Sequence, residues 1–198
     1  MRCWAGSSRA RRAALLVVLA LLGWAGQASS KVFLTVDEAL RLAFPGAGMI
    51  RRTAYLTAEQ VRRAKELSGE EVPSALVTYY EAKRNGQNSQ PVGTAYFDTH
   101  RVRTLPETLM VVVDPQGRVV RVEVIAFREP EEYLPRGAWY EQLLGKKLDR
   151  DLQVKRNVHP VTGATLTVRA TTSAVRRVLA IHQVISGQAE KPGKGKKP

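Results

Sequence analysis

Residues 159–167 read His-Pro-Val-Thr-Gly-Ala-Thr-Leu-Thr, and a long stretch of mixed apolar and basic residues follows them. Gly163 can adopt either sign of φ and Ala164 adds only a methyl group, so a bulky group can approach the hydroxyl of Thr165. A helix that begins within a few residues would offer unpaired N–H groups and a positive dipole end to a phosphate. Thr167 is the expected cap of that helix. The stretch therefore predicts an attachment point for an anionic group, although the tetrapeptide alone also suits an ordinary turn.

The segment after this turn predicts a helix from about Val168 to Ile185. Arg169, Arg176 and Arg177 are expected largely on one side of this helix, which should be a basic face. Apolar residues recur at helical spacing and define the opposite, core-facing side: Ala174, Val175, Val178, Leu179, His182 and Ile185.

Strand-forming residues fill several segments upstream of this helix. The segments are 75–82, 93–98, 108–114 and 118–127, with turns expected at Asn85-Gly86 and at 115–117. The last segment alternates in a way typical of a sheet with one well-buried face. Val120, Val122, Val124 and Ala126 are expected on one side, and Val119, Arg121, Glu123 and Ile125 on the other.

Two capping boxes mark helices near the beginning of this region. Thr35 with Glu38 precedes an apolar stripe that ends at Pro45-Gly46, and Thr57 with Gln60 precedes another that ends at Gly69. Two further segments are predicted to be a short helix, 137–144, and a strand or extended link, 148–154. The chain of 198 residues has the size of one domain. We expect an α+β fold, with an antiparallel sheet and helices packed against it.

The motif at 159–165 resembles that of the FMN-binding domain family, found in subunits of membrane redox complexes and in small exported proteins. The family pattern is Asp-x-x-(Ser/Thr)-Gly-Ala-(Thr/Ser), and further similarity lies in the hairpin at 111–119, the loop at 128–133 and the helix at 139–146. The similarity covers roughly residues 93–185. It implies FMN attached by a phosphoester to Thr165 and installed by a flavin transferase that uses FAD. The chain departs from the pattern at His159, where the family has Asp.

The resemblance also implies which side chains surround the cofactor. Thr165 is the attachment residue, and Thr162, Gly163, Ala164 and Thr167 form the turn around it. Tyr133 and Trp139 are expected to stack on or edge the flavin ring, and Glu129 to orient it or to hydrogen-bond its polar edge. No catalytic residue and no metal ligand is predicted, because the three histidines lack zinc-site spacing and the lone cysteine, Cys3, lies before the expected domain.

The N-terminus predicts export. Arginines precede an apolar run at 13–24, and small residues at 26–28 suit cleavage after Ala28, so residues 1–28 are expected to be a signal peptide. The run is short for a bilayer span, which favours cleavage and leaves retention as an anchor as the alternative. We expect a periplasmic protein or one on the outer face of the cytoplasmic membrane.

The rest of the chain divides into three expected parts. Residues 29–92 should hold the N-terminal helices and first strands, 93–187 the FMN-binding core, and 188–198 a disordered basic tail. The formal net charge of the whole chain is +13. An exported protein is not expected to meet nucleic acid, so the positive charge favours binding to an acidic redox protein or to an anionic membrane surface. The alternative is that the charged residues only keep the protein soluble.

Two function classes follow from the sequence. The first is an exported flavoprotein that passes electrons between a membrane redox complex and an acceptor, more an electron carrier than a stand-alone enzyme. The second is a non-redox binding or sensor module on the same fold without covalent flavin, which His159 in place of Asp keeps open. A flavin reductase is a weaker third class, because no nicotinamide-binding glycine motif is present.

Overall fold

The computed structural model describes residues 31–84 and 91–187. It contains one six-stranded sheet, in which every neighbouring pair is antiparallel and the strand order is β1-β6-β5-β4-β3-β2. The strands are β1 (Lys31–Val32), β2 (Gly48–Tyr55), β3 (Leu76–Lys83), β4 (Gly93–Arg101), β5 (Pro106–Val113) and β6 (Val119–Phe127). The helices are α2 (Val36–Ala43), α3 (Ala58–Ser68), α4 (Gly137–Tyr140) and α5 (Thr165–Ile185), with short 3-10 turns η1 (Glu131–Tyr133) and η2 (Glu141–Leu143).

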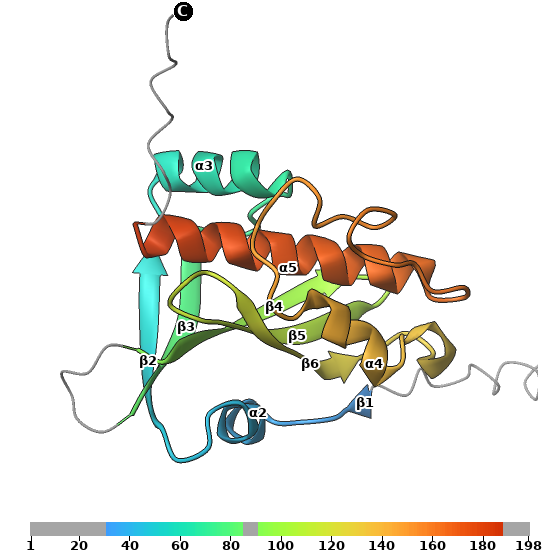
Figure 1. Ribbon diagram of the computed structural model, residues 1–198, viewed down its shortest axis with the longest axis horizontal. Coiled ribbons are helices and arrows are strands. Elements are labelled where there is room, and N and C mark those ends of the chain that lie inside the picture. Colours follow the sequence, from blue (N-terminus) through green and yellow to red (C-terminus); the bar gives the residue numbers. More distant parts are fainter. Residues whose placement is uncertain (1–30, 85–90, 188–198) are drawn as a thin grey trace, which may run out of the picture.

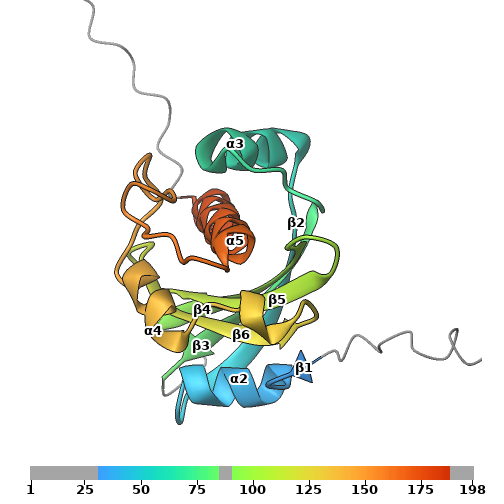
Figure 2. The same ribbon diagram turned by 90° about the vertical axis from the view of Figure 1, so that its right-hand side faces the viewer.

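The elements stack in layers. Figure 2 shows α5 across one face of the sheet, α3 on the far side of α5, and α2 under the opposite face. Figure 1 shows α5 running along the sheet, with α4 beside its N-terminal half. The predicted α+β architecture in a single domain is confirmed. The two expected parts 29–92 and 93–187 share this one sheet, since β2 and β3 continue it beyond β4.

Local sequence accounts for the first two helices. Thr35 and Glu38 cap α2 reciprocally, and Thr57 and Gln60 do the same for α3. Gly69 ends α3 with φ +73°, a conformation that glycine adopts without strain. Both capping-box predictions are confirmed. None of the helices in the described ranges is long and apolar enough to cross a bilayer.

The core lies on both faces of the sheet. The larger cluster packs β4, β5 and β6 against α5 and includes Leu109, Val111 and Leu179. A smaller cluster lies under α2 and includes Leu40 and Met110. Because both faces are covered, the sheet does not have the single buried face that the sequence predicted.

A bulge changes the orientation of side chains along β6. The pairing with β5 passes over Val120, an extra residue between Val119 and Arg121. Val119 consequently shares the α5-side core with Val122, whereas Ile125 lies in the core under α2. The prediction that Val119 and Val122 face opposite ways is therefore wrong.

Other expectations need correction as well. The segment 148–154 forms turns rather than a strand, apart from an isolated bridge between Val154 and Val158. The strand β2 was not predicted, and α5 begins at Thr165, three residues earlier than expected. The expected signal peptide, the Asn85-Gly86 turn and the basic tail lie outside the described residues.

Arg176 and Arg177 do not form an exposed basic face on α5. Each is at most 9% exposed. Arg176 donates to the backbone carbonyls of Ser68, Asp149 and Leu152, and so ties α5 to α3 and to the loop beyond η2. Of the three arginines expected on this face, Arg169 alone is exposed.

Candidate functional site

The turn 161–164 delivers the chain into the first residue of α5. Gly163 has φ +84°, where a side chain would be strained, and the space around its missing Cβ is open to 4 Å. Ala164 occupies the N-cap position and is buried, so no side chain caps the helix. The first N–H groups of α5 are therefore available to an external acceptor, which suits a phosphate.

Thr165 presents its hydroxyl at this helix end. The residue is exposed, and its Oγ1 makes one long hydrogen bond of 3.4 Å to the carbonyl of Val161. Thr162 is also exposed but does not line the pocket described below. Thr167 is not the cap that the sequence predicted. It is fully buried and donates to the carbonyl of Tyr133 at 2.6 Å, which fastens η1 to α5.

A pocket of about 230 Å³ lies beside Thr165. It brings together the predicted residues Gly163, Ala164, Thr165, Thr167 and Tyr133, and adds Val102, Arg103 and Leu166. The volume is below the roughly 300–1,000 Å³ of typical small-molecule pockets. It can therefore enclose only part of a ligand as large as a nucleotide, the remainder lying over the open surface.

Arg103 supplies the positive charge of this pocket. Its guanidinium lies 5.4 Å from the centre of the Tyr133 ring, a cation–π contact at the pocket wall. An arginine next to uncapped helix N–H groups forms a favourable environment for a phosphate. Arg103 was not among the predicted site residues. The signal available in the sequence was a basic residue in the short loop between two predicted strands.

Glu129 holds the loop that carries Arg103. Its Oε1 accepts from the backbone N–H groups of Arg103, Thr104 and Leu105 at 3.2, 2.7 and 2.8 Å. Burial alone would raise the pKa of this carboxyl, but the three N–H donors outweigh burial and the pKa lies below its ordinary value. In this structure Glu129 therefore acts on the pocket through the loop, as a fixed anion at neutral pH.

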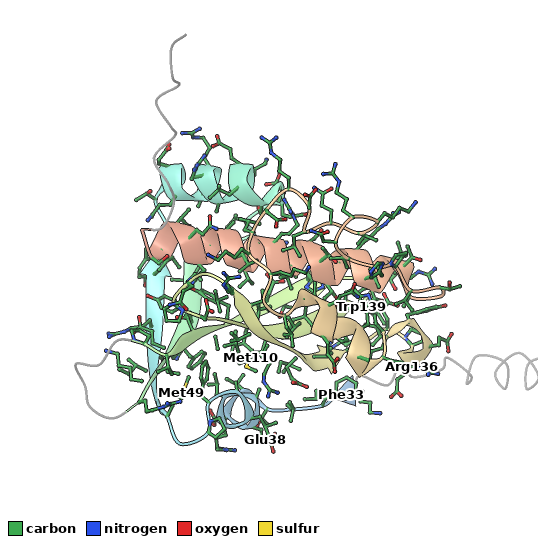
Figure 3. All side chains as sticks on the ribbon, viewed as in Figure 1. Phe33, Glu38, Met49, Met110, Arg136 and Trp139 are labelled. Atoms are coloured by element: carbon green, nitrogen blue, oxygen red, sulfur yellow. The ribbon has the colours of Figure 1, made fainter. Side chains whose placement is uncertain are left out.

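Trp139 holds the segment that precedes the motif. Its indole Nε1 donates to the carbonyl of His159 at 2.8 Å, and the side-chain oxygen of Gln142 accepts from the His159 N–H at 2.7 Å. Figure 3 labels Trp139 close to α4 and α5. The ring is buried in the core and does not line the pocket beside Thr165. His159 itself is exposed.

A chain of buried polar groups runs between β4, β5 and α5. Arg177 donates twice to Asp98, at 2.9 and 2.7 Å. The two ring nitrogens of His100 lie 3.0 Å from Asp98 Oδ1 and 3.0 Å from Glu107 Oε2. Thr171 also donates to Glu107 Oε2, at 3.1 Å. These five side chains link the strands that flank the loop 102–105 to α5, at Thr171 in its second turn and at Arg177 in its fourth.

Both ring nitrogens of His100 face carboxyl oxygens. A neutral imidazole has one N–H, whereas both nitrogens here face carboxylate oxygens, so two protons are needed if both carboxyls are ionised. Burial lowers the pKa of His100, but hydrogen bonds to Asp98 and Glu107 outweigh it and raise the pKa above its ordinary value. The two carboxyl groups therefore favour the protonated form of His100. No group of three or more His, Cys, Asp or Glu that could hold a metal occurs within 31–84 and 91–187.

Part of the chain that forms this site matches a known protein family. Residues 105–180 match the family model described as the FMN-binding domain. The match runs from β5 through most of α5 and includes the turn at Thr165. It indicates FMN as the cofactor. Neither the curated proteins nor the solved structures that were compared with the chain contain a match.

Proposed function

We propose that this chain, whose residues 105–180 form an FMN-binding domain, carries FMN covalently on Thr165 and serves as an exported electron-transfer protein. The observation that carries the proposal is the position of Thr165. Its exposed hydroxyl stands at the uncapped N-terminus of a 21-residue helix, in a pocket with Arg103. The residues present thus fit a flavin phosphate, which needs positive charge and N–H donors.

Each residue around Thr165 has a defined part in this proposal. The first N–H groups of α5 and Arg103 would hold the phosphate, and the open space at Gly163 would let the nucleotide approach. Tyr133 forms the wall against which the attached group would lie. Bound FMN supplies one- and two-electron redox chemistry, so the protein needs to hold the ring and exclude competing contacts.

Attachment requires a flavin transferase that uses FAD. The Thr165 oxygen would form a bond to the phosphorus of the FMN half while the pyrophosphate bond breaks. AMP would leave, and the hydroxyl proton would pass to solvent. Export to the periplasm or the outer face of the membrane is proposed from the arginine-led apolar run at 13–24. The proposed partners are a membrane redox complex and its acceptor, with an anionic membrane surface as a further contact.

The alternative is a non-redox binding or sensor module that lacks covalent flavin. It is favoured by His159 in the place of the acidic residue of the family pattern. The two proposals differ in one observable, the presence of flavin that survives denaturation.

Thr165→Ala tests the attachment. Co-expressed with a flavin transferase, wild type should give a fluorescent band in a denaturing gel, and Thr165→Ala should give none. The variant should fold normally, because Thr165 is exposed and its one hydrogen bond is long. Thr165→Ser should retain labelling, since the hydroxyl is kept. Thr162→Ala is the matched control, an exposed hydroxyl in the same turn, and should label like wild type. Full labelling of Thr165→Ala would place the flavin elsewhere.

A further inference from the structure

The outer edge of β6 is largely unpaired in the described part of the chain. The short strand β1 pairs with this edge at Phe127 and Ala126 alone. Next to it, the N–H groups of Phe33 and Leu34 both donate to the carbonyl of Ile125. No described strand pairs with the edge between 120 and 124.

The backbone direction along this edge follows from the pairing of β6 with β5. Val119 bonds outward to Lys146 and Gly145, and Ile125 bonds outward to the segment after β1. On β5, Asp114 and Pro106 both bond to β6, and alternation along β5 means that Val112 and Met110 do so too. Their partners Arg121 and Glu123 therefore bond to β5, and Val122 and Val124 direct their N–H and C=O groups outward. The free edge therefore offers two residues to an added strand, which is the usual site for pairing with another chain.

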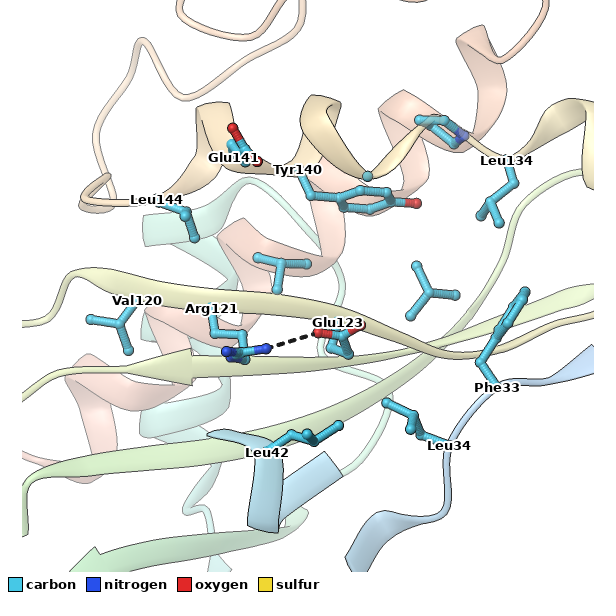
Figure 4. Close-up of a pocket in the computed structure, with 14 residues that line it drawn as sticks. Phe33, Leu34, Leu42, Val120, Arg121, Glu123, Leu134, Tyr140, Glu141 and Leu144 are labelled. Carbon is cyan, nitrogen blue, oxygen red and sulfur yellow. Dashed lines mark hydrogen bonds and ion pairs between the residues drawn. The ribbon is translucent and has the colours of Figure 1, made fainter. Parts of the chain in front are cut away.

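Apolar side chains line a groove along the same edge. The groove has a volume of about 720 Å³ and lies between α4 and the segments around β1 and α2 (Figure 4). Four of its large apolar side chains are 37–53% exposed: Phe33, Leu42, Val120 and Leu144. At the centre, Arg121 and Glu123 form an ion pair of 3.2 Å with both side chains partly open to solvent. The groove thus combines a free strand, apolar walls and two opposite charges.

The charges on this edge of one copy are complementary to those on the same edge of a second copy. If two copies of β6 pair antiparallel about a twofold axis at Val122, Arg121 of each copy lies opposite Glu123 of the other. Val120 then lies opposite Val124, and Val122 opposite itself. Outward-facing Val122 forms the central hydrogen-bonded pair of such a ladder, and Arg121 with Glu123 forms the non-hydrogen-bonded pairs beside it, in which side chains lie closest together. A contact of this kind is closed, because each surface is used once.

The opposite edge of the sheet lacks this property. It is formed by β2, where Arg51 and Arg52 are adjacent and no acidic residue occurs within 48–55. Pairing of two β2 edges about a twofold axis would bring arginines together, which disfavours it. Self-association is thus favoured at β6 and opposed at β2.

We propose that the occupant of the β6 groove is a second copy of this chain, joined by antiparallel pairing of the two β6 edges about Val122. The two sheets form one continuous sheet across the twofold axis. The exposed apolar side chains around the groove pack against those of the partner, with the Arg121–Glu123 pairs exchanged between copies. The contact is independent of flavin, so it stands apart from the proposed function.

Charge reversal tests this register. Analytical ultracentrifugation of residues 29–198 should show a dimer for wild type. Arg121→Glu alone and Glu123→Arg alone should each raise the dimer dissociation constant at least about tenfold, because like charges then lie opposite each other. An equal mixture of the two single variants should form heterodimers, since all four charges become complementary. The double variant Arg121→Glu/Glu123→Arg should dimerise like wild type.

Arg52→Glu is the matched control, a charge reversal of an ion-paired arginine at the far edge of the same sheet. It should leave the dimer unchanged. Circular dichroism of each variant checks folding, and recovery in the mixture excludes misfolding as the cause of dissociation. A monomeric wild type, single variants that dimerise like wild type, or a mixture that stays monomeric would each overturn the proposal.

Discussion

The site around Thr165 consists of an exposed hydroxyl and of buried residues that hold the segments around it. Thr165 is exposed at the helix end, whereas Thr167, Glu129 and Trp139 are buried and hold the surrounding segments. Thr167 fixes η1, Glu129 fixes the loop with Arg103, and Trp139 fixes the segment before the motif. A pre-formed site of this kind needs little rearrangement when a cofactor is attached.

His159→Asp should speed flavin attachment. The backbone of His159 is held by Trp139 and Gln142, while the side chain is exposed, so the substitution should leave the fold unchanged. It restores the acidic residue of the family pattern, which the transferase would read. The measurement is the rate of gain of in-gel flavin fluorescence with purified transferase and FAD. Identical rates for wild type and His159→Asp would show that this position plays no part in recognition.

Asp98→Asn should destabilise the fold by about 3–5 kcal/mol, because it leaves the buried guanidinium of Arg177 without its counter-charge. Urea unfolding followed by circular dichroism measures the loss. Glu59→Gln, which removes an exposed ion pair on α3, is the control and should change stability little. A loss for Asp98→Asn no larger than that for Glu59→Gln would show that the buried cluster does not stabilise the fold.

Among the site residues, the sequence predicted the roles of exposed groups better than those of buried ones. The motif identified Thr165 and its small neighbours, because small residues next to a hydroxyl in a turn leave room for a bulky group. It did not reveal that Thr167 would be buried, since a threonine near a helix start looks the same whether it caps or donates elsewhere. The partners of Glu129 lie 24 to 26 residues away, a separation that a local pattern does not encode.

The elements that were predicted well carry local signals. Capping boxes located α2 and α3, and helical spacing located α5. The strand β2 was missed because Arg51 and Arg52 interrupt its apolar residues, and its place is set by pairing with β3. The basic face expected on α5 failed because α3 and the loop beyond η2 cover Arg176, and Asp98 on β4 pairs with Arg177.

The interface between β4, β5 and α5 should respond to pH through His100. Its pKa is raised in the folded protein, so its contribution to stability is complete below its unfolded pKa of about 6.5 and is lost as pH rises through the folded value. Burial lowers the pKa of His182, so the stability that His182 contributes is lost as pH falls. A change in stability above about pH 7 can therefore be assigned to His100 and not to His182.

Glu107→Gln tests this dependence. The new amide can donate to a neutral imidazole, so His100 no longer needs two protons. The free energy of unfolding in urea should fall as pH rises above about 7 for wild type and stay nearly constant for the variant. Equal slopes for the two proteins would mean that His100 does not hold the extra proton.

The whole molecule is larger than the part that matches the FMN-binding domain. The match begins at residue 105, but β2, β3 and β4 complete the sheet, and α3 covers the outer side of α5. The N-terminal part is therefore needed to bury the helix that presents Thr165. With that helix held on two sides, its N-terminus is a fixed platform for a phosphate.

We propose that this helix N-terminus carries FMN on Thr165. The most direct test is tandem mass spectrometry of peptides from wild-type protein that was co-expressed with a flavin transferase, denatured and digested. The peptide containing 159–167 should gain the mass of one FMN less one water, with the modification on Thr165. An unmodified peptide in protein that keeps flavin after denaturation, or the complete absence of denaturation-resistant flavin, would contradict it.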